Sequence, residues 1–215
     1  MRVVGVDEAG RGCFIGPLVV AGAAFRSEDV HILGELGVRD SKQLTARRRE
    51  KLYDQIMEIA VATSFFYIQP RSIDSVVTRS VKLRRLNYLE AMVMAKVIRD
   101  LEPDEAYVDA SDVNAARYGE SIRDVIRERP RIVSEHKADS TYLVVSAASV
   151  LAKVRRDAAV AALREEYGDF NSGYCHDVKA LRWLESWFGE HEECPPFVRA
   201  SWKTVSRIRQ NVRGT

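Results

Sequence analysis

Two adjacent carboxylates stand near the start of the chain, directly after a short apolar run. Asp7 and Glu8 follow residues 3–6, Val-Val-Gly-Val, and precede the glycine-rich segment 9–12. Neighbouring acids repel one another, so a buried strand that ends in two of them needs a compensating positive charge. A divalent cation supplies that charge and uses the carboxylates as ligands. The pair therefore predicts a metal site.

Further acids follow other short apolar segments. Asp109 ends the segment 106–109, Asp112 lies three residues on, and Asp139 precedes a long apolar helix. Each also has an ordinary structural interpretation: a helix N-cap for Asp139, the start of a surface loop for Asp109, an exposed turn for Asp7 and Glu8. Acids at the ends of separate strands commonly meet at one edge of a sheet, and their joint occurrence favours that interpretation.

Clustered carboxylates of this kind suit phosphodiester hydrolysis. Two hard cations can activate a water and stabilise the leaving oxygen of an in-line displacement. No arrangement of Ser, His and Asp or of Cys and His competes in the sequence, because only His136 lies beside a candidate acid. Gly10, Arg11 and Gly12 form a candidate ligand contact, since glycines allow close backbone approach while arginine or exposed amides meet phosphate or hydroxyl oxygens.

The elements that must position these residues follow from the apolar pattern. Short apolar runs with β-branched and aromatic residues predict strands over 3–7, 18–25, 61–68, 106–109 and 131–134. Helical spacing predicts helices over 46–60, 81–101, 115–129, 142–167, 179–188 and 198–212. This order predicts one mixed α/β sheet flanked by helices. Because adjacent strand residues point to opposite faces, Asp7 and Glu8 converge only if their strand ends there and turns.

The composition bounds the class of protein. With 215 residues, 46% of them apolar and 30% charged, the chain fits one soluble α/β domain with an extension. The early apolar segment 17–25 is too short to span a bilayer and lacks a signal-peptide pattern, so we expect a cytoplasmic protein with no membrane partner. The three cysteines show no metal-ligand spacing and are expected to be reduced thiols. Basic clusters at 39–51 and 199–213 suit either a solvated surface or a polyanion.

Several motifs in this chain, taken together, resemble the signature of the ribonuclease HII family, the type 2 ribonucleases H. They appear in family order over about the first 177 residues, and the segment 195–199 is similar to the archaeal branch. The motifs are Asp7-Glu8-Ala9-Gly10-Arg11-Gly12, Gly16-Pro17-Leu18-Val19, Asp40-Ser41-Lys42-Gln43-Leu44-Thr45, Tyr107-Val108-Asp109, His136-Lys137-Ala138-Asp139, Ser146-Ala147-Ala148-Ser149 with Ala152-Lys153, and Ser172-Gly173-Tyr174.

The resemblance implies an α/β ribonuclease H-like fold, with a central mixed five-stranded sheet flanked by helices. A composition shift near Gly173 places a catalytic domain at 1–172 and a C-terminal helical substrate-binding extension at 173–215. The family's activity implies an endonuclease acting on RNA/DNA hybrids and on ribonucleotides embedded in duplex DNA. It would cut on the 5′ side of a ribonucleotide, leave 3′-hydroxyl and 5′-phosphate ends, and serve to remove misincorporated ribonucleotides and RNA primers.

By the same resemblance, four acids would be catalytic residues and metal ligands. Asp7, Glu8, Asp109 and Asp139 would hold two divalent ions, Mg²⁺ or Mn²⁺, during catalysis. The sequence does not assign either ion to a particular acid. A monomer is expected, and docking to a replication clamp has no evident motif in the tail.

The resemblance also implies substrate contacts. Gly10, Arg11 and Gly12 would sense the ribose 2′-hydroxyl, which separates RNA from DNA at a site. Lys42 would meet a phosphate, and Tyr174 would pack on the sugar beside the RNA–DNA junction. Cys13 and the segment 175–178 depart from the family pattern beside these contacts.

Some alternatives stay open at this point. Ser146, Ser149 and Lys153 share one helical face, which either borders the substrate or packs against another element. The basic residues of the last helix, Arg199 among them, are candidates for phosphate contact. A junction resolvase of the same fold class and a non-catalytic nucleic-acid-binding module are the competing functions.

Overall fold

The computed structural model describes residues 1–38, 44–79, 86–126 and 130–214. Lys42 lies outside these residues, as do the ends of the helices predicted over 81–101 and 115–129. Within the described part, no helix is long and apolar enough to cross a membrane.

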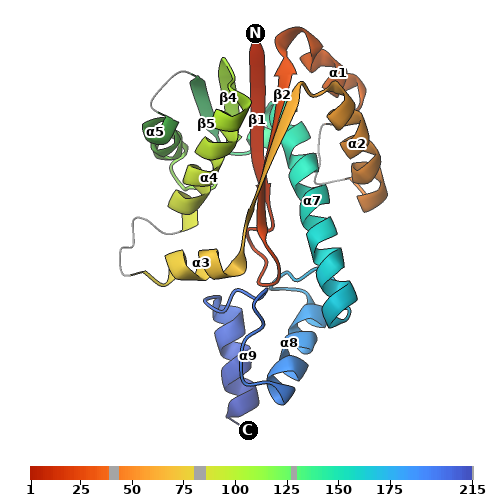
Figure 1. Cartoon of the computed structure of the whole chain (residues 1–215), viewed down its shortest axis with the longest axis vertical. Helices are drawn as coiled ribbons and strands as arrows, with labels where there is room; N and C mark the ends of the chain where they lie inside the picture. Colours follow the sequence, from red (N-terminus) through yellow and green to blue (C-terminus); the bar gives the residue numbers. More distant parts are fainter. Residues whose placement is uncertain (39–43, 80–85, 127–129, 215) are drawn as a thin grey trace.

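A mixed five-stranded sheet forms the centre of the molecule, as predicted. Its strand order is β3-β2-β1-β4-β5. β1 pairs antiparallel with β2 and parallel with β4, while β3 and β5 form the two edges (Figure 1). The strands are β1 (Arg2–Ala9), β2 (Leu18–Arg26), β3 (Ala62–Ile68), β4 (Glu105–Asp109) and β5 (Arg131–Glu135).

Helices cover both faces of this sheet. One face packs against α4 (Leu86–Leu101) and α5 (Ala115–Ile126), and the other against α7 (Leu143–Tyr167), with α1 (Val30–Glu35) and α2 (Ala46–Ile59) beside it. Figure 1 shows α8 and α9 beyond the far end of the sheet, with α8 next to the end of α7. The remaining helices are the 3₁₀ turn η1 (Ser27–Asp29), α3 (Pro70–Val77), α6 (Ala138–Thr141), α8 (Val178–Glu190) and α9 (Lys203–Arg213).

Two predictions of element boundaries are wrong. The last helix begins at Lys203 rather than at 198, because Val198 bridges Ile15 and the Arg199 amide donates to the Phe14 carbonyl at 2.8 Å. The first strand does not end at Asp7, because its pairing with β2 continues through Ala9. The short helices α1, α3 and α6 were not predicted.

The two ladders of β1 stop at different places. Its pairing with β2 runs to Ala9 opposite Val19, whereas its pairing with β4 stops at Val6 opposite Val108. The strands β1 and β4 therefore carry the next residues, Asp7 and Asp109, at the point where the parallel ladder has ended. We call this place the β1–β4 gap.

Alternation along β1 distributes its side chains between two cores. Val4 and Val6 belong to the core under α4 and α5, while Val3 and Ala9 belong to the core under α7. Gly5 lies against the start of α7, where a Cβ atom would meet the Val144 carbonyl oxygen at 2.0 Å. The sheet and α7 are in backbone contact at this position.

A third core joins the loop after β1 to the C-terminal helices. Phe14 and Ile15 of that loop are fully buried together with Phe170, Leu184 and Phe197. The C-terminal extension is therefore packed directly on the segment that follows the first two acids. Whether 173–215 forms a separate domain stays a prediction.

Candidate active site

Three acids from three elements meet at the β1–β4 gap. Asp7 of β1, Asp109 of β4 and Asp139 of α6 each place one carboxylate oxygen within 4.8 Å of those of the other two. Asp7 and Asp139 are buried, so the interpretation of Asp7 as an exposed turn residue is wrong. Tyr142 holds the N-cap position of the long helix α7, and Asp139 lies inside α6, so Asp139 is not the N-cap of the long helix.

The backbone positions two of these carboxylates. The Glu8 amide donates to Asp7 Oδ1 at 2.7 Å, and the Ala138 amide donates to Asp109 Oδ1 at 3.0 Å. Burial raises the pKa of Asp7 well above its usual value, and the nearby charge of Glu8 raises it further, while a hydrogen bond from Ser149 on α7 lowers it. Asp112 lies outside the cluster, because it accepts hydrogen bonds from Asn87 and Arg117.

Glu8 points to the opposite face of the sheet from Asp7, as alternation in an unbroken strand requires. Its Oε1 accepts a hydrogen bond from the Ser111 hydroxyl at 2.9 Å. Its Oε2 is buried and has no hydrogen-bond partner within the described structure. Burial, followed by the charge of Glu90 on α4, raises the pKa of Glu8 to about 8, and Asp109 contributes in the same direction.

The donor set fits a hard divalent cation. Carboxylate oxygens are the ligands that Mg²⁺ and Mn²⁺ prefer, and one oxygen from each of three carboxylates converges here. The unpartnered Oε2 of Glu8 is a further oxygen that a cation would satisfy. The acidic cluster thus accounts for divalent metal use, while the place of Glu8 among the ligands stays a prediction.

The loop after β1 turns its arginine inward. Gly10 adopts φ +89°, a conformation that favours glycine, and its carbonyl accepts from the Cys13 amide at 3.2 Å. The Arg11 guanidinium donates to both Glu90 oxygens, at 2.9 and 3.1 Å, and to Asn87 Oδ1 at 2.6 Å. These bonds occupy Nε and Nη2 of the side chain, and the backbone amides of the loop are further donors that can meet a ligand.

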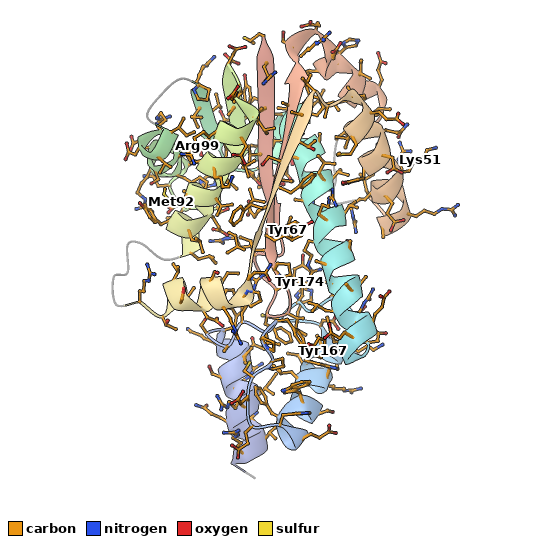
Figure 2. All side chains as sticks on the ribbon, viewed as in Figure 1. Lys51, Tyr67, Met92, Arg99, Tyr167 and Tyr174 are labelled. Carbon is orange, nitrogen blue, oxygen red and sulfur yellow. The ribbon has the colours of Figure 1, made fainter. Side chains whose placement is uncertain are left out.

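Tyr174 lies beside this loop. It forms an isolated bridge with Cys13, and the Arg156 guanidinium stands 5.0 Å from its ring centroid. The His176 ring lies 5.5 Å away. Figure 2 places Tyr174 between the end of the sheet and the C-terminal helices. The structure therefore places Tyr174 beside Cys13, the residue that follows Gly12, and its contact with a sugar stays a prediction.

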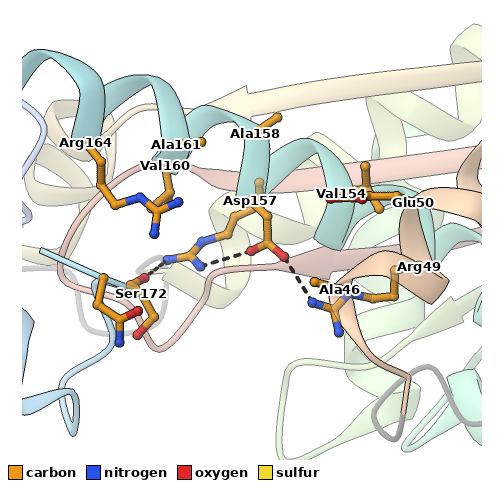
Figure 3. Close-up of a pocket in the computed structure, with 12 residues that line it drawn as sticks. Ala46, Arg49, Glu50, Val154, Asp157, Ala158, Val160, Ala161, Arg164 and Ser172 are labelled. Carbon is orange, nitrogen blue, oxygen red and sulfur yellow. Dashed lines mark hydrogen bonds and ion pairs between the residues drawn. The ribbon is translucent and has the colours of Figure 1, made fainter. Parts of the chain in front are cut away.

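A pocket of about 460 Å³ lies along the second half of α7 (Figure 3), and its lining contains arginines and acids but none of the three acids of the cluster. Arg49 of α2 and Arg156 of α7 both pair with Asp157, at 3.2 and 3.3 Å. Arg164 and Ser172 also line the pocket. Since Ser172 directly precedes Gly173 and Tyr174, the pocket flanks the predicted substrate contacts.

The helical face shared by two serines and a lysine has a structural role. The Ser146 hydroxyl is buried and donates to the Val38 carbonyl, which confirms packing for this residue. Ser149 accepts a hydrogen bond from Lys153 at 2.9 Å and also bonds Asp7. This face supports the acid cluster from α7.

Two residues of this region were not identified correctly from the sequence. Glu90 is fully buried on α4 beside Glu8, although it occupies the apolar stripe that contains Val93, Val97 and Leu101. A charged residue on such a stripe is the signal that could have identified it. Arg199 was a candidate for phosphate contact, which is wrong, because its side chain is fully buried.

Comparisons with known proteins agree with this geometry. Residues 4–205 match the family Ribonuclease HII. The chain is 42% identical over 213 residues to the ribonuclease HII of Pyrococcus abyssi, which covers 99% of this chain and 93% of that protein.

Solved structures give the same result. The crystal structure of the ribonuclease H2 from Pyrococcus horikoshii has a TM-score of 0.91 and 38% identity, with 100% of both chains covered. The ribonuclease HII of Archaeoglobus fulgidus, solved in complex with PCNA, has a TM-score of 0.85 and 40% identity, with 97% of both chains covered. Sequence and fold match over nearly the whole length, so this chain belongs to the ribonuclease HII family and is a ribonuclease H endonuclease.

Proposed function

We propose that the protein cuts the phosphodiester on the 5′ side of ribonucleotides, both in RNA/DNA hybrids and where they are embedded in duplex DNA. The products would carry 3′-hydroxyl and 5′-phosphate ends, and the role would be removal of misincorporated ribonucleotides and RNA primers. The observation that carries this proposal is the cluster of Asp7, Asp109 and Asp139, which the strand β1 joins to a loop whose Arg11 and Gly12 amides donate no hydrogen bond within the described residues.

The four acids would form the metal-binding and catalytic set. Asp7, Asp109 and Asp139 would hold Mg²⁺ or Mn²⁺, with Glu8 contributing its unpartnered Oε2. Two such ions, when bound, would supply an activated water and stabilise the departing 3′-oxygen. The hydrogen bond from Ser111 to Glu8 orients one of these carboxylates before any ion arrives.

Substrate choice would come from the loop and from Tyr174. A 2′-hydroxyl can accept a hydrogen bond from a backbone amide, and deoxyribose has no such group. Gly12 has open space where a Cβ would stand, so a sugar can approach the backbone there. Tyr174, placed beside the loop, would pack on the sugar next to the junction, and Lys42 would meet a phosphate.

The test is cleavage of three duplexes in Mg²⁺ and in Mn²⁺: one with a single embedded ribonucleotide, one RNA/DNA hybrid and one of DNA only. We expect the first two to be cut, with the product ends identified by mass spectrometry. Asp7→Asn should abolish cleavage while hybrid binding persists. Full activity of this variant would refute the assignment; cutting of the DNA-only duplex would favour a resolvase, and no cutting would favour a binding module.

The partner, the oligomeric state and the location of this chain are also proposals. The Archaeoglobus fulgidus relative was solved with PCNA, and docking of this chain to a replication clamp would be tested by co-elution of the two proteins. A monomeric state and a cytoplasmic location are likewise expected.

A further inference from the structure

A fully buried arginine of the C-terminal extension reaches into the loop after β1. Arg199 has no exposed surface. Its Nη2 donates to the Gly10 carbonyl at 2.8 Å and to the Gly16 carbonyl at 3.1 Å, and its Nη1 donates to the Arg11 carbonyl at 3.0 Å. Its Nε also donates to Gly16, at 3.3 Å. One side chain thus holds both ends of the loop 10–16.

Burying a guanidinium in this way costs free energy, so we expect the position of the loop to matter for function. Arg199 makes no ion pair within the described residues, and its charge is compensated by carbonyl oxygens and by the Trp202 ring, 5.0 Å away. Burying a charge without a counter-ion is unfavourable, and apolar residues often fill such a space at lower cost. Burial lowers the pKa of Arg199 to about 10, so the guanidinium is still protonated near neutral pH.

The direction of the loop amides follows from these hydrogen bonds. In a trans peptide the carbonyl of one residue and the N–H of the next point in opposite directions. Since the Gly10 and Arg11 carbonyls point at Arg199, the Arg11 and Gly12 N–H groups point away from it. Neither of these N–H groups donates a hydrogen bond within the described structure.

We propose that Arg199 is a positioning residue for ribose recognition: it fixes the two peptide planes that present the Arg11 and Gly12 amides to the 2′-hydroxyl. The inference rests on the proposed function, because it assumes that this loop senses the ribose. Through Arg199 the C-terminal extension would help to distinguish ribose from deoxyribose, in addition to any direct contact that the extension makes with the duplex.

The alternative is that Arg199 merely fastens the extension to the core. Asp74 of α3 provides a matched control. It binds the two residues that follow Arg199, and it makes no hydrogen bond to the loop 10–16. Its carboxylate accepts from the Ala200 amide at 2.9 Å and from the Ser201 amide at 3.0 Å. Loosening the extension through Asp74 therefore leaves the Arg199 contacts to the loop in place.

The experiment compares Arg199→Lys and Asp74→Asn with the unmodified chain, each normalised to its folded fraction. Lysine keeps the charge, but its single nitrogen cannot span the Gly10, Arg11 and Gly16 carbonyls. We expect Arg199→Lys to lower kcat/KM for a single-ribonucleotide duplex at least tenfold, with the Ki of a DNA-only competitor unchanged within twofold. Asp74→Asn should keep kcat/KM within twofold of the unmodified chain, even if it lowers the melting temperature as much as Arg199→Lys does.

Two results would overturn the inference: an unchanged kcat/KM in Arg199→Lys, or an equal loss in Asp74→Asn. If Arg199→Lys does not fold, hydrogen exchange on the Asp7→Asn chain replaces it. The Arg11 and Gly12 amides should be protected by the ribonucleotide duplex and not by the DNA-only duplex, and equal protection by both would refute the role. Failure of the unmodified chain to cut the ribonucleotide duplex would instead refute the proposed function.

Discussion

Gly5→Ala tests whether the backbone contact between β1 and α7 sets the geometry of the acid cluster. The added Cβ would stand 2.0 Å from the Val144 carbonyl oxygen, 2.1 Å from its carbonyl carbon and 2.5 Å from the Val145 nitrogen. Real Cβ contacts essentially never fall below 3.0 Å, so α7 and β1 must separate by at least about 1 Å here. All three atoms belong to the backbone, so no side-chain rotation relieves the overlap.

The expected cost follows from two opposing effects. Replacing glycine by alanine within a strand is by itself favourable by roughly 0.5–1 kcal/mol. Overpacking that displaces backbone costs about 1–3 kcal/mol and sometimes more. With three backbone overlaps the upper end applies, and subtracting the favourable effect leaves a net loss of about 2 kcal/mol. For a domain of this size that corresponds to a melting temperature lower by about 4–8 °C.

Calorimetry of Gly5→Ala against Gly189→Ala checks this expectation. In Gly189→Ala, on α8, the Cβ meets no atom within 4 Å, and the helix should gain up to about 1 kcal/mol. Cleavage by Gly5→Ala should also fall at a temperature where both variants are folded, because Asp139 lies just before the start of α7. The reasoning would be refuted if the melting temperature of Gly5→Ala lay within 2 °C of that of the unmodified chain, because 2 °C corresponds to at most about 1 kcal/mol.

Two further predictions concern the titration of the site and the open face of the loop. In metal-free protein the carboxyl pKa values of Glu8 and Glu90 are raised from 4.5 to about 8 and about 7, so the folded state binds more protons, and their contribution to stability is lost as pH rises from about 4.5 to 8. Urea unfolding at pH 5.5 and 8.5 should show this loss in EDTA and a smaller one in saturating Mg²⁺; the same loss in both would argue against a bound cation. Gly12→Ala should leave unfolding unchanged within about 0.5 kcal/mol, since its Cβ meets no atom within 4 Å, yet slow cleavage at an embedded ribonucleotide; undiminished cleavage would remove the loop from the substrate path.

Most of the fold could be predicted from local patterns in the sequence. Short apolar runs with β-branched and aromatic residues predicted all five strands, and the long helices were found because their apolar stripes and proline stops are visible without tertiary information. The end of β1 was predicted wrongly, because its pairing from Asp7 to Ala9 depends on β2, ten and more residues away. The helices α1 and α3 were missed since each is short, with no side-chain cap at its start.

The arginines of the site were harder to interpret from the sequence than its acids. Arg11 and Arg199 both looked like contacts for a polyanion, and both instead bond to the protein itself: one to Glu90, the other to carbonyls of the loop 10–16. A sequence shows which side chains carry charge, but their partners lie 79 and 189 residues away. Burial of Arg199 depends on the packing of the extension, which local composition does not report.

The position of Asp7 and Glu8 on opposite faces explains why adjacent acids can serve one site without a turn. Beyond Val6 the strand β1 has lost its partner β4, so no ladder separates the two faces at the β1–β4 gap. The charges are already coupled across it: Glu8 raises the pKa of Asp7, and Asp109, on the Asp7 side, raises that of Glu8. Each acid then needs its own support, which α7 provides through Ser149 and the loop after β4 through Ser111. A turn at Asp7 would bring the two carboxylates together, but it would also remove the β2 pairing that places the loop 10–12 beside them.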